Sequence, residues 1–200
     1  MIDTIAEHDS CIPLREQARS HGESLVVAVA TLVCRVAGTR LRSGRSCLVL
    51  AGSDVVEREA LLVLQVARLQ GAWPLLFAGS GTSSLAEKAK RLGADAAETW
   101  PLASTPDRVL CELCRPRVEH AFCIGVLPEG LRAALSVTAD DGEVVVLDRC
   151  DGQDGRLNFY PDLHRRQVSL RGIDRRCEPT KRQMSAAEWL VRTGRIRVEG

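Results

Sequence analysis

The stretch that decides the fold is CLVLAGSDVVEREALLVLQVARLQG, residues 47–71. Its first five residues, Cys47 to Ala51, form a short continuous apolar run, which is typical of a strand covered on both faces. From Glu57 to Gln70 apolar residues recur at helical spacing on one face, and Gly71 is a natural helix end. A buried strand, a turn and a helix in this order form the repeating unit of a parallel α/β sheet.

The remainder of the chain repeats this unit. Strands are expected at 47–51, 74–78, 96–100, 120–125, 142–148 and 168–173. Helices are expected at 24–38, 57–70, 84–92, 106–114, 128–137 and 181–193, with an irregular segment at 149–166. This alternation predicts an α/β protein with a doubly wound, Rossmann-like parallel sheet of about six strands. We expect a single domain at 24–200, preceded by a lead-in segment at 1–23.

The overall charge is balanced. Twenty-seven basic and 26 acidic residues leave a net charge of +1, which gives no general attraction to nucleic acid. The longest apolar run, Leu25 to Cys34, is about half a membrane span and lies too far inside the chain for a signal peptide. We therefore expect a soluble, cytoplasmic protein with neither nucleic acid nor membrane as a partner. The strong preference for arginine over lysine is typical of a high-GC bacterial source.

The eight cysteines are scattered, and several lie inside apolar runs. This pattern, without a secretion signal, favours buried thiols over disulfides. Cys111 and Cys114 share one face of an expected helix, but a metal site needs two more ligands, and a redox pair needs a cysteine at a helix N-terminus. We interpret this pair as helix packing and expect no zinc.

In a doubly wound sheet, a ligand binds at the carboxyl ends of the strands, where the strand order reverses. After the first strand only one glycine of a Gly-x-Gly-x-x-Gly pattern is present, Gly52, and Asp54, Glu57 and Glu59 crowd the helix start. Acidic residues stabilise a free helix N-terminus but repel a diphosphate. A pyrophosphate site and a capped helix that binds no anion therefore both remain open.

After the second strand, the loop Gly79 to Ser84 offers hydroxyls and free amides, but no acid for a ribose 2′-hydroxyl. This favours NADP over NAD, although the usual arginine is also missing, and an ordinary N-capping loop explains the same residues. The candidate cofactor-binding residues at the strand ends are Gly52, Ser53, Gly79, Ser80, Thr82, Gly125 and Val126.

Candidate acid–base groups lie further along the chain. Asp148, Tyr160 and His164, with Arg149, fall near the same sheet edge, but nothing in their spacing selects a reaction. The chain contains neither a Gly-x-Ser-x-Gly elbow nor a P-loop, which counts against common hydrolases and NTPases. The arginines from Arg165 to Arg176 could meet phosphates or an acidic partner, but nearby aspartates favour an internally paired surface.

Several stretches resemble the cofactor-binding domain of the medium-chain, zinc-type alcohol dehydrogenase superfamily, from about residue 23 to the end. The stretches are Leu64–Ala72, Leu85–Asp95, Gly142–Leu147, Asp162–Gly172 and Thr193–Ile196. The resemblance implies a Rossmann domain of an NAD(P)-dependent oxidoreductase lineage. It also implies a homodimer formed through the last strand, Val168 to Ile173.

The departures from this family are equally informative. The chain has no room for the GroES-like catalytic domain, and it lacks the Gly-His-Glu metal signature, the four-cysteine lobe and most of the glycine fingerprint. One hypothesis is an NAD(P)-binding domain that a separate catalytic partner completes. The other is a domain with a degenerate dinucleotide site, reused as a non-redox biosynthetic enzyme, a scaffold or a binder of a small molecule in the cleft.

Overall fold

The computed structural model describes residues 25–52, 56–80, 83–100, 117–126, 128–147, 163–173 and 178–197. In these ranges six strands form one all-parallel sheet in the order β3-β2-β1-β4-β5-β6. The strands are β1 (Cys47–Ala51), β2 (Leu75–Ser80), β3 (Ala96–Trp100), β4 (Val118–Ile124), β5 (Thr138–Val146) and β6 (Ser169–Gly172). The prediction of an α/β fold with a doubly wound parallel sheet is confirmed.

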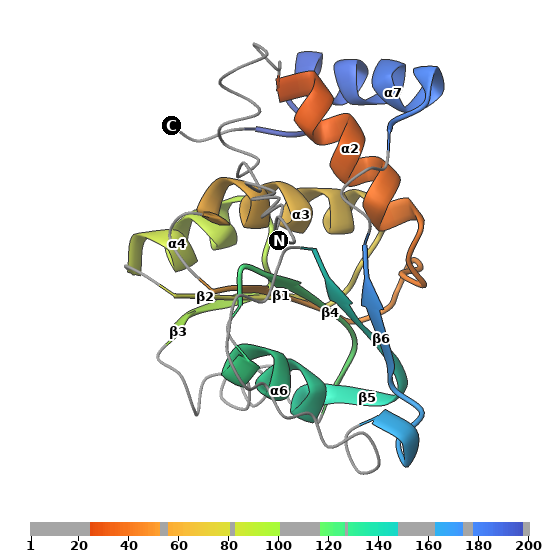
Figure 1. Ribbon diagram of the computed structural model, residues 1–200. Coiled ribbons are helices and arrows are strands. Elements are labelled where there is room, and N and C mark those ends of the chain that lie inside the picture. The colour runs from red at the N-terminus through yellow and green to blue at the C-terminus, as the bar shows by residue number, and fades with distance from the viewer. Residues whose placement is uncertain are drawn as a thin grey trace, which may run out of the picture.

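Helices cover both faces of this sheet. They are α2 (Leu25–Ala37), α3 (Glu57–Leu69), α4 (Ser83–Arg91), α6 (Pro128–Val137) and α7 (Lys181–Arg192). Figure 1 shows α2, α3, α4 and α7 on one side of the sheet and α6 on the other. The last helix, α7, packs along α2, so the first and last described helices of the chain lie side by side.

The apolar core consists of two layers, one on each face of the sheet. Along β1, Cys47, Val49 and Ala51 belong to the layer under α2, α3 and α4, whereas Leu48 and Leu50 belong to the layer facing α6. All five residues of β1 are buried. Burial on both faces is the reason that this strand reads as a continuous apolar run rather than as an alternating pattern.

Most element boundaries agree with those expected from the sequence, and β5 is the main exception. It begins at Thr138, directly after α6, rather than at Gly142. Its register with β4 shifts between Val118 and His120, and Asp141 adopts a positive φ of 61° beside this irregularity. The early part of β5 is polar and partly exposed, so no apolar pattern marks it in the sequence.

The cysteines correct one prediction in part. Cys47 and Cys123 are buried thiols outside any disulfide, as expected, but Cys34 is disulfide-bonded. Cys34 is half-buried on α2, and a helical apolar pattern does not reveal that it forms a disulfide. Cys111, Cys114 and the expected helix at 106–114 lie outside the described residues, as does the lead-in segment at 1–23.

No helix in the described ranges is long and apolar enough to cross a membrane.

Candidate functional site

The carboxyl ends of the central strands form the candidate site. β1 has β2 on one side and β4 on the other, so the strand order reverses between β1 and β4. The last residue of β1, Ala51, is in register with Gly79 of β2 and with Ile124 of β4. The sheet therefore brings the candidates Gly52, Gly79 and Gly125 to three adjacent strand ends.

Gly52 makes the closest backbone approach in this region. Its N–H donates to the Ile124 carbonyl at 2.9 Å. A Cβ at Gly52 would lie 2.0 Å from the Gly125 carbonyl oxygen and 2.5 Å from Val126 Cα. Because backbone atoms fill that space, this glycine is needed for β1 to end against β4, whether or not a ligand binds nearby.

Gly79 has a different neighbourhood, at the end of β2. A Cβ there would lie 2.8 Å from Leu85 Cδ2 and 2.9 Å from Phe77 Cε1. Leu85, in the first turns of α4, thus packs directly over this strand end. Ser80 is the last residue of β2, and Ser53 and Thr82 lie outside the described residues.

The N–H groups and charged side chains in the first turn of α3 determine how well this site would bind an anion. Val56 is the N-cap residue of α3, and its apolar side chain cannot accept hydrogen bonds from the first N–H groups of the helix. Lys88 Nζ, from α4, lies 2.8 Å from Glu57 Oε1, and Arg35 Nη1, from α2, lies 3.6 Å from Glu59 Oε1. Both carboxylates are therefore paired with cations from neighbouring helices.

These residues fit a dinucleotide, the cofactor that the fold implies, with electrostatics weaker than those of a glycine-rich turn. Within the described residues the first N–H groups of α3 have no side-chain cap, and α3 follows the end of β1 at the reversal point, where a diphosphate binds in such sheets. The carboxylates of Glu57 and Glu59 reduce the attraction for the diphosphate, and Lys88 and Arg35 offset part of this effect.

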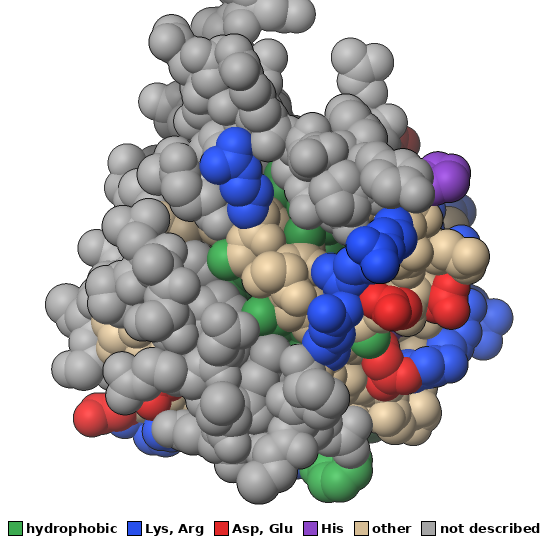
Figure 2. All heavy atoms as spheres, turned by 90° about the horizontal axis from the view of Figure 1, so that it is seen from below, with side chains coloured by type: hydrophobic (Ala, Val, Ile, Leu, Met, Phe, Trp, Pro, Cys, Tyr) green, Lys and Arg blue, Asp and Glu red, His purple; other side chains and the backbone are tan. Residues whose placement is uncertain are grey.

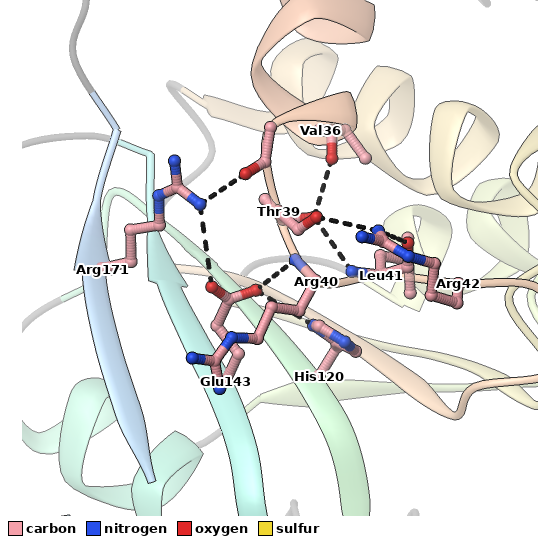
Figure 3. Close-up of polar contacts among 9 residues, drawn as sticks. Val36, Thr39, Arg40, Leu41, Arg42, His120, Glu143 and Arg171 are labelled. Carbon is pink, nitrogen blue, oxygen red and sulfur yellow. Dashed lines mark hydrogen bonds and ion pairs between the residues drawn. The ribbon is translucent and has the colours of Figure 1, made fainter.

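A second polar cluster lies at the opposite, amino end of the sheet (Figure 3). His120 of β4 and Glu143 of β5 are register neighbours with side chains that are 5% and 3% exposed. The Glu143 carboxylate accepts a hydrogen bond from the Arg40 N–H at 2.8 Å, and Arg171 of β6 lies 4.0 Å away. This cluster was not anticipated, because only the register of β4 against β5 brings its two buried members together.

The acid–base candidates are not brought together within the described residues. His164 is exposed, whereas Asp148 and Tyr160 lie outside the described ranges. His164 lines a shallow hollow with Leu163, Gln167 and Val168.

Two arginines of the basic C-terminal third, Arg166 and Arg171, lie beside acidic side chains. Figure 2 shows acidic side chains directly beside basic ones on the face below the sheet. Arg166 donates to Asp140 at 2.9 Å, and Arg117 lies 3.0 Å from the same carboxylate. The hydrogen bond from Arg166 holds the pKa of Asp140 below its ordinary value. Paired surface charge was expected here, and among the described residues Arg166 pairs with Asp140 and Arg171 approaches Glu143. The aspartates between 148 and 162 lie outside the described residues.

Within the described ranges, His, Cys, Asp and Glu side chains nowhere gather in the groups of three that a metal ion would require.

Several solved structures of dehydrogenases share this fold. A zinc-binding dehydrogenase from Sinorhizobium meliloti 1021, bound to NADP, matches with a TM-score of 0.72 and 20% identity over 87% of this chain and 49% of its own. Benzyl alcohol dehydrogenase from Acinetobacter calcoaceticus matches with a TM-score of 0.71 and 18% identity, over 86% of this chain and 46% of its own. 2R,3R-butanediol dehydrogenase from Bacillus subtilis matches with a TM-score of 0.68 and 20% identity, over 85% of this chain and 46% of its own.

The chain thus has the fold of part of a zinc-type dehydrogenase and spans about half the length of these proteins. The resemblance seen in the sequence is confirmed at the level of the fold. No protein-family model matches the sequence, and no curated protein sequence matches it significantly.

Proposed function

We propose that this chain is an NAD(P)-binding domain of the zinc-type dehydrogenase fold that acts in an oxidoreductase together with a separate catalytic partner. The observation that carries the proposal is the position of Gly52, Gly79 and Gly125 at three adjacent strand ends, where the strand order reverses. A bound nicotinamide would supply hydride transfer. The similar fold of the NADP-bound Sinorhizobium meliloti dehydrogenase supports this placement.

The candidate residues divide between the two ends of such a cofactor. Gly52, Gly125 and Val126, which follow the ends of β1 and β4, would lie along the diphosphate and the nicotinamide. The second group, Gly79 and Ser80 at the end of β2, would lie near the adenosine ribose. The sequence after β2 offers hydroxyls there and no carboxylate, which favours NADP over NAD.

Titration with NADPH and with NADH, followed by nucleotide fluorescence, tests the proposal. We expect NADPH to bind the native chain at micromolar concentrations and Glu57→Gln to bind it about three- to tenfold more tightly. The substitution removes a negative charge from the first turn of α3 and frees Lys88 from its ion pair. Glu188→Gln, an exposed site on α7, serves as the matched control and should bind like the native chain.

Flat titrations of the native chain and of Glu57→Gln with both nucleotides would contradict the proposal.

A second candidate function is a domain without redox chemistry that binds another small molecule at the same strand ends. The favouring observation is the acidic first turn of α3, where Glu57 occupies the position of the third glycine of the dinucleotide pattern. Such a turn suits a neutral or cationic ligand better than a diphosphate. This function predicts flat nucleotide titrations and a rise in melting temperature with neutral or cationic small molecules.

We also propose that the chain forms a homodimer through β6. Within the described sheet β6 pairs with β5 on one side only, and Leu170 on this edge strand is 37% exposed. An open edge strand presents backbone groups that can pair with a second copy.

A further inference from the structure

The buried pair of His120 and Glu143 lies at the amino end of the sheet, remote along the strands from the glycines of the candidate cofactor site. His120 is in register with Cys47, the first residue of β1, whereas Gly52 follows the last residue of that strand. His120 Nδ1 and Glu143 Oε2 are 3.5 Å apart, and both side chains are almost fully buried. The proposed cofactor binding makes no use of this pair.

The Glu143 carboxylate connects three segments. Its Oε2 accepts from the N–H of Arg40, in the segment that follows α2, at 2.8 Å. Its Oε1 lies 4.0 Å from Arg171 Nη1 on β6, and the same guanidinium donates to the Gly38 carbonyl at the end of α2 (Figure 3). The end of α2, β5 and β6 therefore meet at one buried carboxylate.

His120 faces this carboxylate without completing a hydrogen bond. Among the described residues Nδ1 has no hydrogen-bond partner, although it is buried. Burial lowers the pKa of His120, whereas Glu143, the Arg40 backbone and Glu119 raise it and Arg45 lowers it; the net shift is downward from 6.5. The guanidinium of Arg171, from β6, is the further charge that faces Glu143. Burial therefore favours the neutral imidazole in the folded protein.

We propose that the His120–Glu143 pair is an acid-sensitive anchor, in which proton uptake by the His120 imidazole loosens the attachment of α2 to the sheet. His120 Nδ1 and the Arg40 N–H both lie at Oε2 of Glu143, so a movement of this oxygen toward the imidazole lengthens its hydrogen bond to Arg40. A protonated imidazole attracts the carboxylate, and closing the distance from 3.5 Å to a hydrogen bond draws Oε2 away from Arg40. Solvent supplies the proton, and no covalent bond changes.

Weaker attachment of α2 to the sheet is expected to affect helix α7 as well. The chain after Arg40 leads into β1, while α2 before it packs along α7. Weakening the link at Glu143 therefore affects α2 and α7, and it leaves the carboxyl ends of β1 and β4 in place.

The sign of the pH dependence follows from the shift of His120. An unfolded histidine has the ordinary pKa of 6.5, and the folded protein binds this proton less readily. The stability contributed by the neutral form is therefore present above that value and is lost as the pH falls below it. At about pH 5.5 the loss in the ratio of folded to unfolded protein from one histidine is at most about tenfold.

The direct test is amide hydrogen exchange measured by NMR at about pH 7.5 and about pH 5.5, with rates corrected for intrinsic exchange. We expect the protection of the Arg40 amide to fall several-fold on acidification in the native chain and to stay constant in His120→Gln. The Gly52 amide, bonded to Ile124 at the other end of the sheet, is the internal control and should keep its protection. His164→Gln, at an exposed histidine, is the matched variant and should behave like the native chain.

A second measurement requires no variant at His120. Titration of the native histidine ring signals should show His120 with a pKa below 6.5 and a shift of the Arg40 amide at the same midpoint. A His120 pKa at or above that value overturns the proposal. An Arg40 amide that does not respond while His120 titrates, or a response that persists in His120→Gln, also overturns it.

Discussion

At the scale of single residues, Gly52 illustrates how a motif residue can have a packing role. The sequence marks it as the remaining glycine of a dinucleotide pattern, and the structure places the Gly125 carbonyl where its side chain would be. The need for glycine at this position therefore follows from the contact between β1 and β4, independently of any ligand. The fingerprint alone could not distinguish these two reasons, because only the sheet order makes β4 the neighbour of β1.

Gly52→Ala should lower the free energy of unfolding by about 3 kcal/mol, because the new methyl group meets rigid backbone 2.0 Å away. Urea denaturation of the purified chain measures this change. Gly172→Ala is the matched control, since no atom lies within 4 Å of its added Cβ, and it should change the stability by less than about 0.5 kcal/mol. Equal stabilities of the two variants would contradict the assigned packing role.

At the scale of elements, the buried side chain of Gln65 attaches the segment after α7 to helix α3. Its side-chain amide donates to the Arg197 carbonyl at 2.9 Å and accepts from the Arg197 N–H at 2.8 Å, as a paired peptide group would. Ile196, the preceding residue, is 2% exposed and packs in the core. This attachment on α3 holds the segment after α7, and so it helps to keep α7 against α2.

Gln65→Ala should cost about 2 kcal/mol of stability, because it removes both hydrogen bonds and leaves the Arg197 backbone groups without this partner. Hydrogen exchange should show the larger effect in 194–197 and α7 than in β1. Gln70→Ala, at the half-buried end of the same helix, should have little effect. A uniform rise in exchange across the sheet would instead indicate a general loss of packing.

At the scale of the whole molecule, the exposed edge strand determines how copies of the chain could associate. The β6 edge joins the sheet only through β5 in the described residues, and three of its four residues are exposed. Pairing two such edges would extend one sheet across both copies and cover Leu170. The candidate cofactor residues lie at the ends of β1, β2 and β4, away from this edge, so dimerisation would leave them accessible.

We expect the native chain to sediment as a dimer at about 10 µM and Leu170→Lys to sediment as a monomer, because a lysine on each edge adds repulsion and desolvation at the contact. Sedimentation velocity measures both states. Leu69→Lys, at a similarly exposed leucine on α3, should remain dimeric. A monomeric native chain would show that β6 is not an association surface at this concentration.

Local patterns were sufficient for most of the fold. The fully buried strand β1 and the helix α6 begin and end at the residues expected from apolar spacing and turn residues. Prediction was poorer where the pattern is polar, as at the start of β5, and for the cysteine on α2 that forms a disulfide. For β5 the outcome depends on its pairing with β4, a strand from an earlier part of the chain.

The sequence by itself determined the alternation of strands and helices, the class of sheet and the glycines at the strand ends, because hydrophobic period and turn chemistry are properties of neighbouring residues. The tertiary structure alone decided which charges meet. Glu57 with Lys88, Glu59 with Arg35 and His120 with Glu143 join residues from different elements. Strand order, register and helix packing set these pairings, and they depend on the burial of the whole core rather than on any local segment.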